Sequence, residues 1–153
     1  MKTLILGLGN PLRCDDGVGN KVAQILGKEI DDSEVTVIET NAVGLGLLDL
    51  LKDYQRAIII DAIQTREGKP GQVHRLSLQD LGTLHHLPTT HDVDLATAVE
   101  LGTKLGLKLP REVTIFAIEV ADIITFSEEC TPQIERAIPR VVKLVLRELK
   151  SAY

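Results

Sequence analysis

Short runs of β-branched and leucine residues alternate with segments of helical period, and this alternation restricts the fold more than any other feature of the chain. Such an order favours a parallel or mostly parallel sheet with helices on both faces. The runs predict five strands, over Thr3–Leu8, Glu34–Glu39, Arg56–Ala62, Gln72–Leu76 and Glu112–Glu119. We therefore expect an α/β fold built on a five-stranded sheet.

The helical segments are amphipathic at both ends of the chain. Apolar residues recur at helical spacing after the first strand (Val18, Val22, Ile25, Leu26) and near the C-terminus (Ile134, Ile138, Val141, Val142). Leucines at 47–51 and apolar residues at 95–102 predict two further helices. Thr131 and Pro132 are typical of an N-cap followed by proline at the first helical position. Pro139 should then kink the last helix or delay its start.

The fourth strand follows a turn at Glu67–Gly71 that is only a few residues long. A parallel crossover between neighbouring strands needs a dozen or more residues. We therefore predict a mostly parallel sheet in which the fourth strand is the antiparallel member.

Composition and charge narrow the class of protein. A chain of 153 residues fits one domain over 1–153, and a net charge of −5 without a basic run argues against nucleic acid as a partner. Cys14 and Cys130 have neither metal-ligand spacing nor a disulfide framework, which fits a reducing compartment. The apolar run Leu4–Gly9 is too short for a signal peptide or a membrane span. We expect a cytoplasmic protein that does not insert into membranes.

The segment Gly7–Gly19 leaves the first strand and opens the first helix. A dinucleotide-binding loop would need a third glycine where Leu12 stands, and Asp15 and Asp16 would repel a pyrophosphate at the helix N-terminus. Two adjacent aspartates cannot both cap one helix. We assign the cap to Asp15 and expect Asp16 to point into the cleft at the carboxyl edge of the sheet.

Asp61 and His91 are the other candidate site residues. Asp61 ends the apolar run 57–60, where a carboxylate either binds the following turn or faces a ligand. His91 stands near the start of a predicted helix, where a histidine is usually a solvated loop residue. With Asp16 and Asp61 at the same edge, the three would leave open coordination positions on a divalent ion such as Ni or Zn.

Other titratable residues carry weaker signals. Glu39 and Glu119 end strands and could face the same cleft, cap a turn or be solvated. His85 and His86 lie in a loop whose role the pattern leaves open, and His74 on an edge strand is expected to be exposed. We expect Cys14 to be structural, because nothing near it in sequence marks an activated thiolate.

These residues together resemble the hydrogenase maturation peptidases. The resemblance rests on three ordered motifs: Gly7-x-Gly9-Asn10-x-Leu12-x-x-Asp15-Asp16-Gly17-x-Gly19, the isoleucine-rich strand ending in Asp61-Ala62, and Thr90-His91-x-x-x-Leu95. It continues weakly through 131–139 and so covers nearly the whole chain. It implies a three-layer αβα sandwich of the phosphorylase/hydrolase-like type with a five-stranded mixed sheet.

The resemblance also implies an activity. Family members are aspartic-type endopeptidases that remove the C-terminal extension from the nickel-loaded large subunit of a [NiFe] hydrogenase. It implies that Asp16, Asp61 and His91 bind the nickel carried by the precursor, so that the metal arrives with the substrate, and that ions such as Cd or Zn occupy the site in vitro. The position of Asp16 is often glutamate in the family. The loops after Glu39 and Glu119 also depart from its pattern, and because we expect them to contact substrate, the particular hydrogenase stays open.

Two alternatives stay beside this interpretation. Peptidyl-tRNA hydrolase shares a strand ending in Gly-Leu-Gly-Asn-Pro, but here Leu12–Asp16 follows instead of that family's continuation, and the acidic balance is wrong for tRNA. A non-enzymatic nickel-sensing assembly factor would carry the same ligands.

No Ser-His-Asp, Cys-His or H-E-x-x-H arrangement is present, so we expect the bound nickel to polarise the carbonyl or a water, with a carboxylate as general base.

Overall fold

A computed structural model describes residues 1–42, 45–81 and 90–151, and for 81 and 90–94 it describes the backbone alone. Five strands form one sheet in the order β2-β1-β3-β5-β4. They are β1 (Thr3–Leu8), β2 (Val35–Thr40), β3 (Arg56–Ile63), β4 (Val73–Leu76) and β5 (Glu112–Glu119). The strands thus match the predicted runs to within about one residue.

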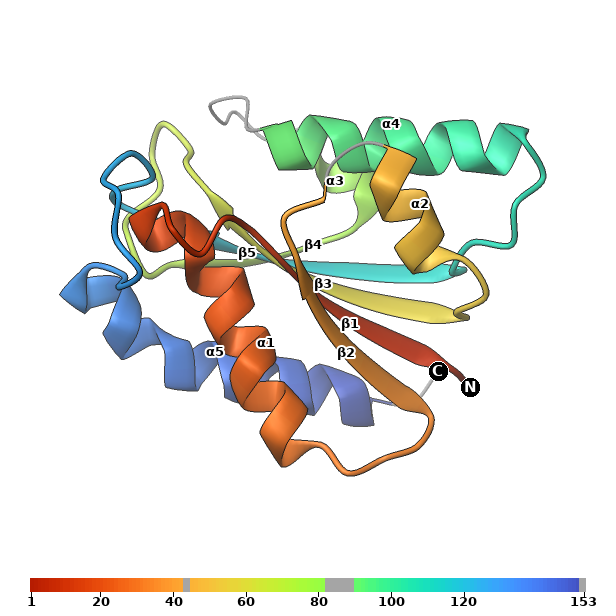
Figure 1. Cartoon of the computed structure of the whole chain (residues 1–153), viewed down its shortest axis with the longest axis horizontal. Coiled ribbons are helices and arrows are strands. Elements are labelled where there is room, and N and C mark those ends of the chain that lie inside the picture. Colours follow the sequence, from red (N-terminus) through yellow and green to blue (C-terminus); the bar gives the residue numbers. More distant parts are fainter. Residues whose placement is uncertain (43–44, 82–89, 152–153) are drawn as a thin grey trace.

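Helices cover both faces of this sheet (Figure 1). α1 (Val18–Glu29) and α5 (Pro132–Lys150) lie on one face, and α2 (Leu45–Leu51), α3 (Leu78–Leu81) and α4 (Thr90–Lys104) lie on the other. A short 3-10 helix, η1 (Cys14–Gly17), precedes α1. The three-layer αβα sandwich expected from the sequence is confirmed. None of the described helices is long and apolar enough to cross a membrane.

Strand direction follows the prediction as well. β1 pairs in parallel with β2 and β3, and β3 pairs in parallel with β5. β4 pairs with β5 in the antiparallel sense and forms one edge of the sheet. The carboxyl ends of β1, β3 and β5 therefore meet at one edge, on the left in Figure 1.

Two apolar clusters lie on the two sides of the sheet. Even-numbered residues of β3, such as Ile58 and Ile60, pack with α1 and α5. Odd-numbered residues, such as Ala57 and Ile59, pack with α2 and with Leu95 of α4. β3 is buried along its whole length, as expected of a central strand covered on both faces.

The last helix excludes one of the two effects expected of Pro139. Thr131 is the N-cap and Pro132 follows at the helix start, as predicted. α5 nevertheless runs without interruption from Pro132 through Pro139 to Lys150, so Pro139 does not delay its start.

Glycines let the backbone of α1 lie directly on the strand ends. A Cβ on Gly19 would collide with the carbonyl oxygen of Ile60 and lie 2.6 Å from that of Leu8. A Cβ on Gly7 would likewise collide with the Gly19 carbonyl oxygen. This close contact fixes η1, which ends two residues before Gly19, over the carboxyl edge of the sheet.

We predict that Gly19→Ala lowers the free energy of unfolding by about 2 kcal/mol or more, because the obstructing atoms belong to the backbone and cannot move aside. Gly27→Ala in the same helix is the matched control. Its Cβ would meet only the Val37 side chain at 3.9 Å, and alanine should stabilise the helix by about 0.5–1 kcal/mol. Urea denaturation of both variants checks the prediction, which fails if the two midpoints move together.

Candidate functional site

The loop between β1 and α1 crosses the carboxyl edge of the sheet. Its Gly9 N–H donates to the Thr40 carbonyl at the end of β2, and the Gly9 Cα faces the Asp16 carbonyl so closely that a Cβ would collide with it. The loop is thereby held against both the strand end and η1. Asp16 is placed by backbone contacts rather than by its own side chain.

The Asp16 side chain is half-buried and held through one oxygen. Its Oδ2 accepts a hydrogen bond from the Asn10 N–H at 2.9 Å. Its other oxygen accepts no hydrogen bond from any residue that the structure describes. A carboxylate oriented in this way can offer an oxygen to a cation.

Asp61 lies in β3 two residues before the strand ends, and it is 2% exposed. Its Oδ1 accepts the Ala62 N–H at 2.9 Å. Pairing with β1 stops at Ile60, so Asp61 is the first residue of β3 beyond that paired stretch. By strand alternation its side chain belongs to the face covered by α2 and α4.

His91 is the second residue of α4, whose N-terminal end lies at the same edge as Asp61 (Figure 1). The backbone therefore brings the start of α4 to the face on which Asp61 lies. The His91 side chain is outside the described residues, so its contacts with Asp16 and Asp61 stay a prediction. Within the described part of the chain, no three His, Cys, Asp or Glu side chains gather as a metal site.

Asp15 does not cap the first helix, and that expectation is wrong. Neither η1 nor α1 has a side-chain cap. The Asp15 carboxylate is fully buried and binds residues more than a hundred positions later in the chain. It accepts the N–H groups of Ala121 and Asp122, both at 3.0 Å, and that of Thr131 at 2.7 Å. The Thr131 hydroxyl also donates to it, so this N-cap residue makes no side-chain bond to its own helix. We call this arrangement the Asp15 clamp.

Both cysteines are buried and free, close to the Asp15 clamp. Burial raises the pKa of the Cys130 thiol to about 12, and burial together with the Asp15 charge raises that of Cys14. The Cys130 thiol donates to the Cys14 carbonyl at 3.7 Å. Neither thiol is an activated nucleophile, which agrees with the structural role expected for Cys14.

Glu119 is neither solvated nor in the cleft of Asp16, because it binds the turn after β3. Its buried carboxylate accepts the Thr65 N–H at 3.1 Å and the Thr65 hydroxyl, and it lies 3.0 Å from His74 Nε2. His74 is therefore half-buried and paired, and its expected exposure is wrong. Glu39 is exposed on β2, while His85 and His86 fall outside the described residues.

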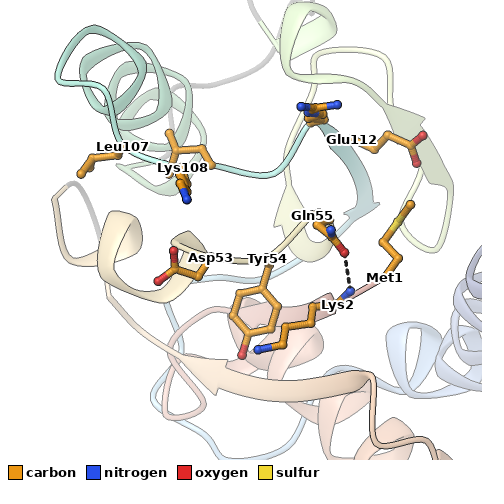
Figure 2. Close-up of a pocket in the computed structure, with 10 residues that line it drawn as sticks. Met1, Lys2, Asp53, Tyr54, Gln55, Leu107, Lys108 and Glu112 are labelled. Carbon is orange, nitrogen blue, oxygen red and sulfur yellow. Dashed lines mark hydrogen bonds between the residues drawn. The ribbon is translucent and has the colours of Figure 1, made fainter.

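A pocket of about 1000 Å³ lies at the opposite edge of the sheet (Figure 2). Lys2 and Gln55 precede the starts of β1 and β3, and Lys108 and Glu112 lie before and at the start of β5. Ligands of open α/β sheets bind outside the carboxyl ends of the strands. This pocket is thus remote from Asp16 and Asp61 and plays no part in the candidate site.

The chain is similar to known proteins over most of its length. Residues 20–148 match the family model described as hydrogenase maturation protease. The hydrogenase 2 maturation protease of Escherichia coli K12 is 24% identical over 99% of this chain and 93% of its own length. A putative hydrogenase maturation protease of Methanocaldococcus jannaschii is 26% identical over 96% of each chain.

Solved structures show the same fold. The hydrogenase maturating endopeptidase HybD of E. coli superposes with a TM-score of 0.86 at 24% identity, covering 98% of this chain and 93% of that one. A hydrogenase 2 maturation peptidase from a Thaumarchaeota archaeon has a TM-score of 0.70 at 28% identity, covering 98% and 99%. Both likenesses extend over nearly the whole of each chain.

The Asp15 clamp predicts different consequences for two neighbouring isosteric substitutions. Asp15→Asn should lower the free energy of unfolding by about 3 kcal/mol, because the amide NH2 would face a buried N–H donor that the carboxylate now satisfies. Asp16→Asn should cost less than about 1 kcal/mol, because the amide oxygen can still accept the single bond from Asn10. Thermal and urea unfolding measure both. Equal losses in the two variants would contradict the clamp.

Proposed function

This chain belongs to the hydrogenase maturation protease family, and on that premise we propose a specific reaction. As a member of this family it is a peptide hydrolase that acts on a hydrogenase precursor. The protein removes the C-terminal extension of the large subunit of a [NiFe] hydrogenase after nickel has been inserted. We propose that this takes place in the cytoplasm.

One observation carries the proposal. The backbone contact of Gly19 with Ile60 sets η1 over the end of β3, so Asp16 and Asp61 come from different faces of the sheet to the same edge. The start of α4, which carries His91, reaches that edge too. Two carboxylates and one imidazole suit a borderline divalent ion and leave coordination positions open for the substrate.

Nickel enters this reaction as part of the substrate. Asp16, Asp61 and His91 would bind the metal that the precursor carries, and this binding would hold the scissile peptide against the sheet edge. The metal supplies Lewis acidity to the peptide carbonyl or to a water molecule. A carboxylate of the site would accept the proton of the attacking water. The raised pKa values of both cysteines argue against an acyl-enzyme on sulfur.

The ligand set also explains how loaded precursor would be distinguished from empty precursor. Three side chains, two of them carboxylates, form a weaker site than the four-ligand cages of structural zinc proteins. Selectivity is a difference between two affinities, so a protein that captured free metal tightly would lose the ability to sense the metal in its substrate. Weak intrinsic binding is thus part of the proposed function.

We predict that the purified protein contains far less than one equivalent of Ni or Zn by elemental analysis. It should leave a metal-free precursor intact and cleave the same precursor once nickel has been inserted, as followed by mass spectrometry of the released peptide. Stoichiometric metal in the isolated protein, or rapid cleavage of the metal-free precursor, would indicate an ordinary metallopeptidase instead.

We further predict that His91→Ala and Asp16→Asn each abolish cleavage of the nickel-loaded precursor, since each removes a ligand of the transferred metal. The melting temperature of Asp16→Asn should stay close to that of the unmodified protein, because Asp16 accepts one side-chain hydrogen bond that the amide oxygen can keep. We expect the same of His91→Ala, since a residue of a surface cleft seldom contributes more than about 0.5 kcal/mol to stability. The matched control is Glu112→Gln, an exposed carboxylate at the start of β5 on the opposite edge of the sheet, and this variant should cleave normally. A folded and fully active His91→Ala variant would remove His91 from the site.

A further inference from the structure

The loop that follows β5 exposes two large apolar side chains beside the candidate site. Ile124 and Phe126 are each 81% exposed, although the other phenylalanine, Phe116, is buried in the core. Leu12 in the β1–α1 loop is 41% exposed. Single exposed apolar residues are common on protein surfaces, but residues brought together on adjoining loops call for an explanation.

Backbone hydrogen bonds join the two loops. Arg13 and Ser127 form a parallel β-bridge, in which the Ser127 N–H donates to the Leu12 carbonyl and the Cys14 N–H donates to the Ser127 carbonyl, both at 2.9 Å. The bridge sets Leu12 and Phe126 at equivalent positions, one residue before the bridged pair. Leu12 and Phe126 therefore lie side by side, and Ile124 precedes Phe126 by two residues in the same loop. We call these three exposed apolar residues the apolar rim.

The apolar rim is rigidly supported. The Asp122 carboxylate accepts the N–H groups of Ile124 and Thr125, both at 2.9 Å, which fixes the turn that carries Ile124. The Asp15 clamp holds the N–H of Asp122 itself and ties this loop to the residue beside Asp16. Apolar side chains held in place before binding lose little conformational entropy on association, which favours a docking role.

Charge around the apolar rim indicates what kind of segment would cover it. The loop carries Asp122 and the exposed pair Glu128 and Glu129. Two cations face these carboxylates: Arg13, which is bridged to Ser127, and Lys21, which lies near Glu129 but is paired with Glu135 at 2.6 Å. Hydrogen bonds from the Thr125 side chain and backbone lower the pKa of Asp122, so its carboxylate stays ionised. An apolar surface bordered by carboxylates complements a segment that presents apolar side chains next to lysine or arginine.

We propose that the apolar rim docks such an apolar and basic segment of the hydrogenase precursor and holds it next to the scissile peptide. This inference rests on the proposed function. The rim is continuous with the loop that ends in Asp16, so a segment seated there would place the adjoining peptide at the carboxyl edge of the sheet. Residues of the rim bind substrate and take no part in the chemical step.

The test is a double variant, Ile124→Ser with Phe126→Ser, assayed on nickel-loaded precursor. Both side chains are mostly solvated in the free protein, so the variant should fold normally, as checked by thermal unfolding. KM should rise tenfold or more while kcat stays within about twofold, the pattern expected when binding is lost equally from ground and transition states. The matched control is Leu105→Ser, which is 66% exposed just after α4 and should leave KM unchanged.

A second variant tests the charge of the partner. Glu128→Lys with Glu129→Lys should also raise KM, and the rise should shrink as salt is added, because exposed charges are screened. An unchanged KM in the serine variant, with normal cleavage by the unmodified protein, would overturn the docking proposal alone. No cleavage by the unmodified protein would overturn the proposed function instead. A dimer of the unmodified protein that dissociates in the serine variant, by analytical ultracentrifugation, would show that a second copy covers the rim.

Discussion

The contact between the backbone of α1 and the ends of β1 and β3 sets the geometry on which the candidate site depends. Gly19 has no side chain, so the helix can lie against the carbonyl groups of Leu8 and Ile60. Any larger residue would lift the helix and with it η1. The position of Asp16 over the end of β3 is thus a consequence of packing at a neighbouring glycine, and chemistry at this edge relies on a residue that takes no part in it.

The adjacent carboxylates of Asp15 and Asp16 have different roles at this edge of the sheet. Asp15 is fully buried and joins the β1–α1 loop to the segment after β5 and to the start of α5. Asp16 is half-buried and keeps one oxygen without a bond from the described residues. Asp15 thus holds the loops in place, and Asp16 can bind a ligand. A buried carboxylate with several N–H donors tolerates burial because each donor offsets part of its desolvation.

Local patterns predicted most of the fold and only part of the site. Strand runs, the antiparallel edge strand and the N-cap at Thr131 could be read from the sequence, because periodicity and turn length act over a few residues. The partners of Asp15 are 106 to 116 positions away, so no local pattern could distinguish a clamp from a helix cap. The pairing of His74 with Glu119 could not be predicted from local sequence for the same reason, since these residues lie 45 positions apart on two strands. The convergence of Asp16, Asp61 and His91 stays a prediction, because the His91 side chain lies outside the described residues.

The Asp15 clamp also constrains the order in which the molecule can be made. Its acceptor is Asp15 and its last donor is Thr131, so closing it brings together parts of the chain that lie 116 residues apart. Loops of that size close at an entropic cost that only the assembled sheet can offset. During synthesis, β1 and β3 can be complete while the carboxylate still has no partner from α5. A nascent chain would therefore carry every candidate ligand well before it could hold them in a fixed arrangement, and competence for the reaction would arise only after Thr131 and the start of α5 have been made.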